Sequence, residues 1–384
     1  MHTPLKMSCF AIGLASVIAS TACLAHGQPF VVDGHRIAAG HREDFELQIP
    51  AGASDPATKI PVTVIHGASK GPVLAIVAGV HGFEFASVLA LAQISEQISP
   101  KSLAGTLVLV RLAHVSAFEE RSPYVNPFDR KNLNRAFPGH LNGTQTERIA
   151  WALSTKIVAK ADFLIDVHSG DGAEWLASFV GVYGGPLSSN YPQALAVAEA
   201  FQFERIVRYS MNTQLQVDRR RSLNRQGVAA GIPTVLVEIG ENGSRRPEDV
   251  KAIVDGIHRT LAVLKMTRTP LPSATHTPLY FDGTSSVPVQ HAGVWTPQAT
   301  GGRILKQGET IGVLRSYHGR VLETVKAPTD GYALYGLNGP PVKSGQSVVT
   351  IAHPASSIQP STDDLKTARP KDDAPTATFE GRQH

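Results

Sequence analysis

A histidine and a glutamate three positions apart, His81 and Glu84, are the first residues of this 384-residue chain whose types and spacing suggest chemistry. They follow a continuous apolar run, Val73 to Val80, which predicts a buried strand of a parallel sheet. Ligands of open α/β sheets bind at the carboxyl ends of strands. There an imidazole and a carboxylate can turn toward one point, and both are ligand types that suit zinc. Such pairs also occur by chance, so a metal site requires a third ligand and a base.

A second candidate strand, residues 162–167, ends at His168. Asp166 and His168 share one face of this strand, because alternate residues of a strand do. Asp166 can therefore orient the imidazole from behind, as carboxylates often do for metal-bound histidines. A histidine that merely ends a strand is the alternative.

A third apolar run, Pro233 to Ile239, contains a single carboxylate, Glu238. Burying an unpaired carboxylate is costly. A structural ion pair with an arginine is one explanation, and a general base beside a metal is another. Burial and a nearby cation would act in opposite directions on its pKa.

The segment between residues 116 and 143 is expected to be a long loop, and such loops in compact domains are usually functional. It contains Arg121, Arg130, Lys131 and Arg135. A solvated basic loop is the simplest reading. However, Asn134 precedes Arg135, and a planar guanidinium beside an amide is well suited to bind a carboxylate.

Alternating strands and helices predict an α/β domain over residues 27–268. The expected helices are residues 84–98, 144–159, 192–200, 220–230 and 247–265, the second of them starting at a Thr144/Glu147 capping box. One strand is expected over residues 176–183. Short strands between glycine turns predict a smaller all-β domain over residues 275–353, and the polar residues 354–384 predict a disordered tail.

The composition is that of a globular protein, with 42% hydrophobic and 18% charged residues. The net charge is only +4, and no basic block is present, so nucleic acid is not an expected partner.

Residues 1–25 read as a cleaved signal peptide, with an apolar stretch too short for a membrane span. This predicts export to the periplasm, with no stable membrane span after processing. An uncleaved anchor and lipidation at Cys23 are the alternatives. Cys9 and Cys23 both lie in this segment, so the mature chain would have neither disulfides nor thiolate chemistry.

Four motifs occur in a characteristic order: His81-Gly-x-Glu84, Asn132-Leu-Asn134-Arg135-x-Phe-Pro-Gly139, Asp166-x-His168-Ser169 and Gly231-Ile-Pro-x4-Glu238-Ile-Gly240. Together they resemble the succinylglutamate desuccinylase/aspartoacylase family, a branch of the zinc carboxypeptidase-like fold. The resemblance covers roughly residues 55–353. It implies a mixed, largely parallel sheet flanked by helices, with a smaller all-β C-terminal domain.

The resemblance also implies one Zn²⁺ per chain, held by His81, Glu84 and His168. Glu238 would be the general base, and Asn134 and Arg135 would bind the substrate carboxylate. Arg121 would stabilise the oxyanion. Arg130 stands where many relatives have a glycine that allows unusual backbone angles, and this makes it a rival to Arg121 in the substrate pocket.

The expected function is zinc-dependent hydrolysis of an amide bond in a small carboxylate-bearing substrate, such as an N-acyl amino acid. An exported metallocarboxypeptidase or cell-wall peptide hydrolase acting on short peptides is the alternative. A non-catalytic protein that holds a carboxylate ligand is a third reading. The presence of Glu238 argues against it, because a binder needs no base.

Overall fold

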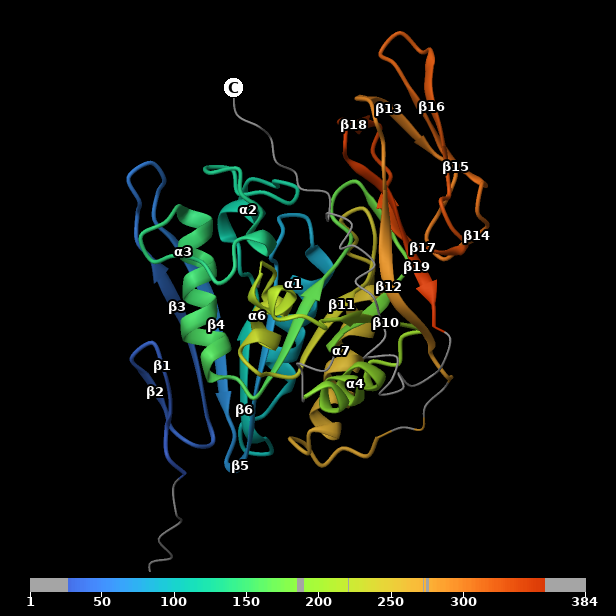
Figure 1. Cartoon of the computed structure of the whole chain (residues 1–384). Helices are drawn as coiled ribbons and strands as arrows, with labels where there is room; N and C mark the ends of the chain where they lie inside the picture. Colours follow the sequence, from blue (N-terminus) through green and yellow to red (C-terminus); the bar gives the residue numbers. More distant parts are fainter. Residues whose placement is uncertain (1–26, 185–189, 220, 272, 274–275, 356–384) are drawn as a thin grey trace, which may run out of the picture.

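A mixed sheet of 13 strands runs through the molecule, and helices cover both of its faces (Figure 1). The computed structural model describes residues 27–184, 190–219, 221–271, 273 and 276–355. The expected signal peptide and almost all of the expected tail lie outside these residues. Among the described helices, none is long and apolar enough to cross a membrane.

The large sheet has the order β14-β17-β19-β12-β10-β9-β11-β7-β5-β6-β4-β3, with β8 paired to β17. Its strands are β3 (His41–Ile49), β4 (Thr58–His66), β5 (Ser69–Ala78), β6 (Ala104–Val110), β7 (Phe163–His168), β8 (Glu174–Leu176), β9 (Phe179–Gly184), β10 (Arg205–Ser210), β11 (Thr234–Glu238), β12 (Leu279–Pro288), β14 (Ile304–Leu305), β17 (Gly331–Leu337) and β19 (Ser347–Pro354). Strands β11, β7, β5 and β6 pair in parallel, so their carboxyl ends share one edge.

The helices are α1 (Phe85–Gln97), α2 (Val115–Glu119), α3 (Gln145–Ala152), α4 (Tyr191–Ala200), α5 (Gln214–Asp218), α6 (Leu223–Ala229) and α7 (Pro247–Val263). A 3₁₀ turn spans Leu133–Arg135 within the long loop. The capping box of Thr144 and Glu147 starts α3 as expected.

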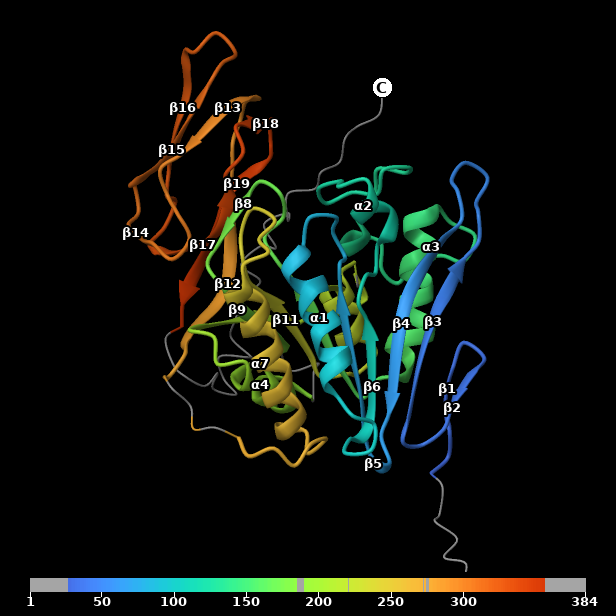
Figure 2. The same ribbon diagram turned by 180° about the vertical axis from the view of Figure 1, so that it is seen from behind.

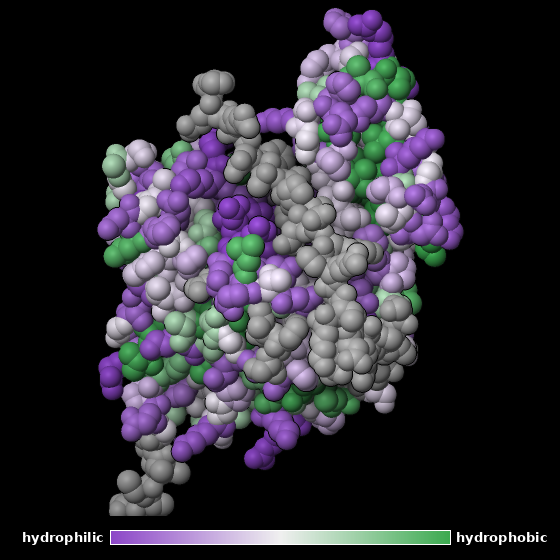
Figure 3. Space-filling view, in the orientation of Figure 1, coloured by the Kyte–Doolittle hydropathy of each residue, from purple (hydrophilic) through white to green (hydrophobic). Residues whose placement is uncertain are grey.

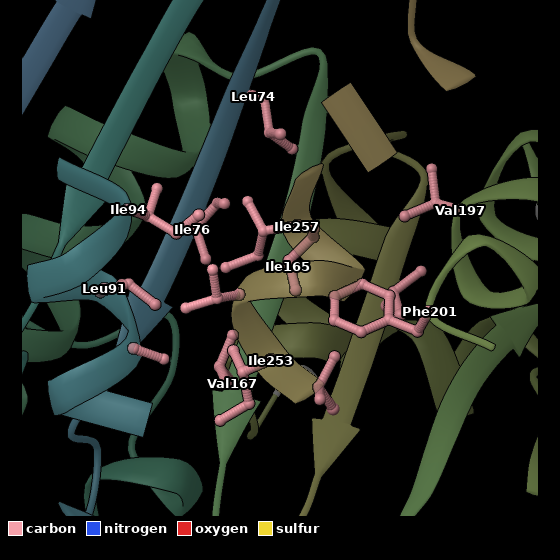
Figure 4. Packing of buried hydrophobic residues seen from close by; sticks show 14 of the residues in the cluster. Leu74, Ile76, Leu91, Ile94, Ile165, Val167, Val197, Phe201, Ile253 and Ile257 are labelled. Carbon is pink, nitrogen blue, oxygen red and sulfur yellow. The ribbon is translucent and has the colours of Figure 1, made fainter. Parts of the chain in front are cut away.

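Helices α1, α4 and α7 cover one face of the sheet (Figure 2), where Leu91, Phe201 and Ile257 pack on the strands (Figure 4). Residues of α3 and α6 pack on the other face. Because both faces are buried, the central strands read as continuous apolar runs rather than as alternating ones.

The β-rich C-terminal part extends the large sheet, because β12 pairs in parallel with β10. Four of its strands form a second, antiparallel sheet that projects from the molecule (Figure 1): β13 (Gly293–Pro297), β15 (Thr310–Arg315), β16 (Val321–Lys326) and β18 (Pro341–Val342). Strands β1 (Phe30–Val32) and β2 (His35–Ile37) form a separate pair. The α/β and β-rich parts are thus joined by backbone hydrogen bonds, while the domain boundaries expected near 268 and 275 stay predictions.

Three sequence-based expectations about elements were wrong. The single strand expected over residues 176–183 is two strands, because β8 pairs with β17 and β9 pairs with β10 and β11. The helix expected over 220–230 begins only at Leu223, where Ser222 is the N-cap, and α5 was not expected at all. The helix expected to reach residue 159 is α-helical only to Ala152 and continues as π and 3₁₀ turns.

Candidate active site

Three side chains from two distant segments, residues 81–84 and the end of β7, meet at the carboxyl edge of the sheet. Ligand atoms of His81, Glu84 and His168 lie within 4.8 Å of one another. Nδ1 of His81 lies 2.6 Å from Oε1 of Glu84, and Nδ1 of His168 lies 2.9 Å from the same oxygen. Two imidazole nitrogens and one carboxylate oxygen therefore converge on one point, as sequence analysis expected.

The fold explains this meeting. His168 ends β7, and Glu84 is the N-cap residue of α1. His81 follows β5, the neighbour of β7 in the sheet. Gly79 lies between the end of β5 and His81. Its φ of +66° favours glycine and lets the chain turn at the strand end.

Both imidazole rings are held from behind by oxygen atoms. Nε2–H of His81 donates to Oδ1 of Asn132 at 3.2 Å. Nε2 of His168 lies 2.9 Å from Oδ1 of Asp166, a distance typical of an ion pair but without the angle of a hydrogen bond. This leaves both Nδ1 atoms facing Glu84, as a metal site requires.

The electrostatics fit a divalent cation. Burial would raise the pKa of Glu84, but His168 and His81 outweigh it and lower this pKa to about 2. The second carboxylate oxygen of Glu84, Oε2, is buried without a hydrogen-bond partner. Side-chain exposure is 3% for Glu84 and 2% for His168 but 11% for His81, so the cluster opens on the His81 side. A buried His/Glu/His set with one open side is the donor set expected of a catalytic metal centre.

Glu238 lies beside this cluster. It ends β11 and is the register partner of His168 on the adjacent parallel strand β7. Burial raises the pKa of Glu238 well above its ordinary value, and the nearby carboxylates add to this, although His168 opposes it. Among the described residues, Glu238 forms no ion pair with an arginine or lysine, so none of them supplies the structural pairing considered from the sequence.

The long loop brings Asn134 and Arg135 to the same edge. Asn134 is buried, and its Oδ1 accepts a hydrogen bond from the backbone N–H of Leu223 at 2.9 Å. Arg135 is exposed, and its Nη1 donates to the backbone oxygen of Asn134. Burial lowers the pKa of Arg135, and Tyr335 of β17 and Tyr183 of β9 are close enough to oppose this shift.

Arg121 and Arg130 both lie on the exposed surface of this loop, which is hydrophilic in the space-filling view (Figure 3). Their backbones are left-handed, with φ of +50° and +58°. Arg130 therefore occupies a conformation that a glycine would adopt without strain. Neither guanidinium has a hydrogen bond to the cluster among the described residues, so their substrate roles stay predictions.

Sequence analysis missed two acidic residues beside the cluster, Asp171 and Glu174. Asp171 is fully buried and accepts the backbone N–H of Tyr124, whose ring packs edge-on against His81 with centroids 5.8 Å apart. Burial and then Asp171 raise the pKa of Glu174 to about 7. Both acids closely follow His168 in the sequence, and this proximity was the available signal.

Fold and site together define an α/β metallohydrolase whose sheet edge carries two histidines and a glutamate. The profile of the succinylglutamate desuccinylase/aspartoacylase catalytic domain matches residues 70–264, about half of the chain. The chain belongs to this family, and it is an amide-bond hydrolase in which His81, Glu84 and His168 form a cluster that could hold a metal ion.

Individual relatives agree with this assignment. The N-α-acetyl-L-2,4-diaminobutyric acid deacetylase of Halomonas elongata is 26% identical over 259 residues, which cover 66% of this chain and 73% of the relative. The product-bound structure of the ectoine utilization protein EutE from Ruegeria pomeroyi superposes with a TM-score of 0.72 at 21% identity, covering 81% of this chain and 95% of EutE. A succinylglutamate desuccinylase/aspartoacylase from Rhodobacter sphaeroides gives 0.71 at 20% identity, covering 82% and 96%. At these identities the two structures support the fold alone.

Proposed function

We propose that this chain is a zinc-dependent deacylase that releases a free amino acid from a small N-acyl amino acid. The observation that carries the proposal is the meeting of His81, Glu84 and His168 at one sheet edge, with Glu238 in register beside them. The diaminobutyric acid deacetylase relative supports an N-acyl amino acid as the substrate class.

The metal is one Zn²⁺ per chain, with the two Nδ1 atoms and Glu84 as its ligands. Imidazole and carboxylate ligands suit zinc, and three protein ligands leave a position open for water or substrate. Bound zinc supplies a Lewis acid and lowers the pKa of a coordinated water to about 7.

Glu238 acts as the general base and then as the general acid. Its carboxylate accepts a proton from the attacking water and returns it to the nitrogen of the breaking amide bond. A buried carboxyl whose pKa is raised holds a proton more readily than an exposed one, which suits the second step.

The substrate is held at its carboxylate by Asn134 and Arg135. Arg135 is exposed and lies at the carboxyl edge, where its fork of donors can bind both oxygens. Arg121 stabilises the oxyanion, and Arg130 is the alternative for this role. Removing one oxyanion donor typically costs about 3 kcal/mol of transition-state stabilisation.

A substrate screen on the zinc-loaded protein tests the proposal. N-acetyl and N-succinyl amino acids are compared with dipeptides and with cell-wall peptide fragments, each with and without a chelator. Release of free amino acid from the N-acyl compounds, and its loss on chelation, is the expected result. Preferential cleavage of peptides would instead support a carboxypeptidase. Tight binding of N-acyl amino acids without turnover would support a binding protein.

We also propose that the protein is exported to the periplasm and loses residues 1–25. The support is the short apolar segment that ends in small residues. Mass spectrometry of the protein from a bacterial host tests this, because cleavage predicts a mature chain that starts at His26. A chain that keeps its first residues in the cytoplasm would refute export.

A further inference from the structure

The two metal-binding histidines are linked to each other through one turn of helix. His81 donates to Oδ1 of Asn132, and the same oxygen accepts the backbone N–H of Asn134 at 2.8 Å. Asn134 in turn accepts the backbone N–H of Leu223, the first residue of α6, at 2.9 Å. A chain of hydrogen bonds thus leads from one imidazole to the start of α6.

The same turn reaches the other histidine. Nδ2 of Asn224 donates to Oδ2 of Asp166 at 3.4 Å, and the other oxygen of Asp166 faces His168. Oδ1 of Asn224 accepts the hydroxyl of Ser222, the N-cap residue of α6. Residues 222–224 are therefore connected by hydrogen bonds to the oxygen partners of both imidazoles, directly to Asp166 and through Asn134 to Asn132.

Burial makes these contacts important. Asp166 has an exposure of 0% and Asn224 of 2%. A buried carboxylate needs partners, and Asn224 donates the one hydrogen bond that the side chain of Asp166 accepts among the described residues. The contact at 3.4 Å is long, so Asn224 restricts the rotation of Asp166 rather than binding it strongly.

We propose that Asn224 is a positioning residue for the metal site. It fixes the carboxylate of Asp166, which fixes the imidazole of His168, while the same turn of α6 fixes His81 through Asn134 and Asn132. The first turn of α6 thus aligns both Nδ1 atoms before metal binds. Neither α6 nor Asn224 touches the ligand position, so their effect passes entirely through the imidazole orientations.

Zinc affinity of three variants tests this inference, which rests on the proposed zinc site. Asn224→Ala removes the amide, and Asn224→Asp keeps its shape but replaces the donor with an acceptor that faces Asp166. Outer partners of metal ligands typically contribute about 10–100-fold to affinity, and Asn224 lies one contact further out, so we expect a loss of about tenfold. Gln226→Ala changes a buried residue of the same helix that has no hydrogen bond to Asp166 among the described residues. It is the matched control and should change affinity less than threefold.

Affinity is measured by competition with a chromophoric chelator, after circular dichroism has shown that each variant is folded. The visible spectrum of the cobalt-substituted protein gives a second readout, because it reports the geometry of the ligands. Both Asn224 variants should alter this spectrum, and Gln226→Ala should not. If Asn224→Ala does not fold, Ser222→Ala decides, since it removes the hydroxyl that holds the amide of Asn224, and a loss of about threefold is expected. The same hydroxyl caps the backbone N–H of Arg225, so circular dichroism must show that the helix content of this variant is unchanged.

Wild-type affinity and an unchanged cobalt spectrum in Asn224→Asp and Ser222→Ala would overturn the inference while leaving the zinc site intact. An equal loss in Gln226→Ala would also overturn it, because the effect would then belong to the helix as a whole. Wild-type protein that binds no zinc would instead overturn the proposed function, and the inference with it.

Discussion

Two regions of this molecule bury carboxylates in opposite ways. Asp55 lies under the start of α3 with Arg148, and the side chains are 3% and 6% exposed. Glu238 lies beside His168 at the edge of the sheet. Asp55 is buried and Glu238 is half-buried, yet the pKa of Asp55 is lowered and that of Glu238 is raised.

The difference lies in their partners. Asp55 forms an ion pair with Arg148 and accepts the backbone N–H of Gln145 at 3.0 Å, and these contacts outweigh the effect of burial on its pKa. Arg148 also donates to the backbone oxygen atoms of Pro50 and Gly143, so both charges are satisfied. Glu238 has other carboxylates nearby instead, and among the largest influences on its pKa only that of His168 lowers it. A buried acid with complete partners stabilises the fold, whereas one without them is available for chemistry.

Glu238→Gln should produce the largest effect. The amide has nearly the same shape but cannot accept the proton of the attacking water, so kcat should fall by about 10²–10⁴-fold. Glu238 is half-buried and has no cationic arginine or lysine partner among the described residues, so its replacement by glutamine should leave the free energy of unfolding unchanged or raised. Steady-state kinetics and urea unfolding of the metal-free protein measure the two. Full turnover by this variant would remove Glu238 from the chemistry.

Asp55→Asn should have the opposite effects, a loss of stability without a loss of kcat. It leaves the guanidinium of Arg148 buried without a counter-charge, and breaking a buried pair in this way costs about 3–5 kcal/mol of stability. The kcat of the folded fraction should be unchanged. Asp255→Asn, in the exposed i,i+4 pair with Lys251, is the matched control and should cost only about 0.3–0.5 kcal/mol. Similar losses in the two variants would show that burial of the Asp55 pair contributes nothing.

The sequence was sufficient to predict the meeting of the metal cluster and Glu238. His81, His168 and Glu238 each follow or end an apolar run, and parallel strands bring such ends to one edge whatever their distance in the chain. Their order β11-β7-β5 in the sheet could not be read from the chain, but the resemblance to the family implied that these residues are neighbours.

The remaining features depend on packing that no local pattern reports. The contact of Asn224 with Asp166 joins residues 58 positions apart, and Tyr335 reaches the vicinity of Arg135 from the β-rich part. The division of residues 174–184 into β8 and β9 follows from the pairing of β8 with β17, far along the chain. Arg130 was predictable only in part. The sequence showed an arginine where relatives have a glycine, but only the structure shows that its backbone is left-handed.

Metal should stabilise the region around His168 and Glu238 and not the region around Asp55. Zinc binds the folded cluster and stabilises it by mass action, by about 2.7 kcal/mol when free zinc is 100 times its dissociation constant. His168→Ala should lose this gain, whereas Asp55→Asn should keep it in full, because Asp55 contributes no metal ligand. Thermal unfolding of His168→Ala and Asp55→Asn, each with and without zinc, measures the gain in each variant. A zinc-dependent gain that survives in His168→Ala would place the bound metal elsewhere.

Acid should weaken the region around Asp55, and the sign of the effect follows from the direction in which the pKa of Asp55 is shifted. The pKa of Asp55 is lower in the folded chain than in the unfolded chain, where it is about 3.9. The contribution of Asp55 is therefore complete above that value and is lost as pH falls toward the folded pKa, because the unfolded chain binds a proton that the folded chain does not. One such proton changes the free energy of unfolding by at most about 1.4 kcal/mol per pH unit. Asp44 and Glu147, whose pKa values are also lowered, add to the loss in every variant. Urea unfolding of wild type and Asp55→Asn between pH 6 and pH 3 isolates Asp55, since the difference between the two proteins should shrink as the pH falls. A difference that stays constant would mean that the Asp55 carboxylate is not held by Arg148 as its charged partner.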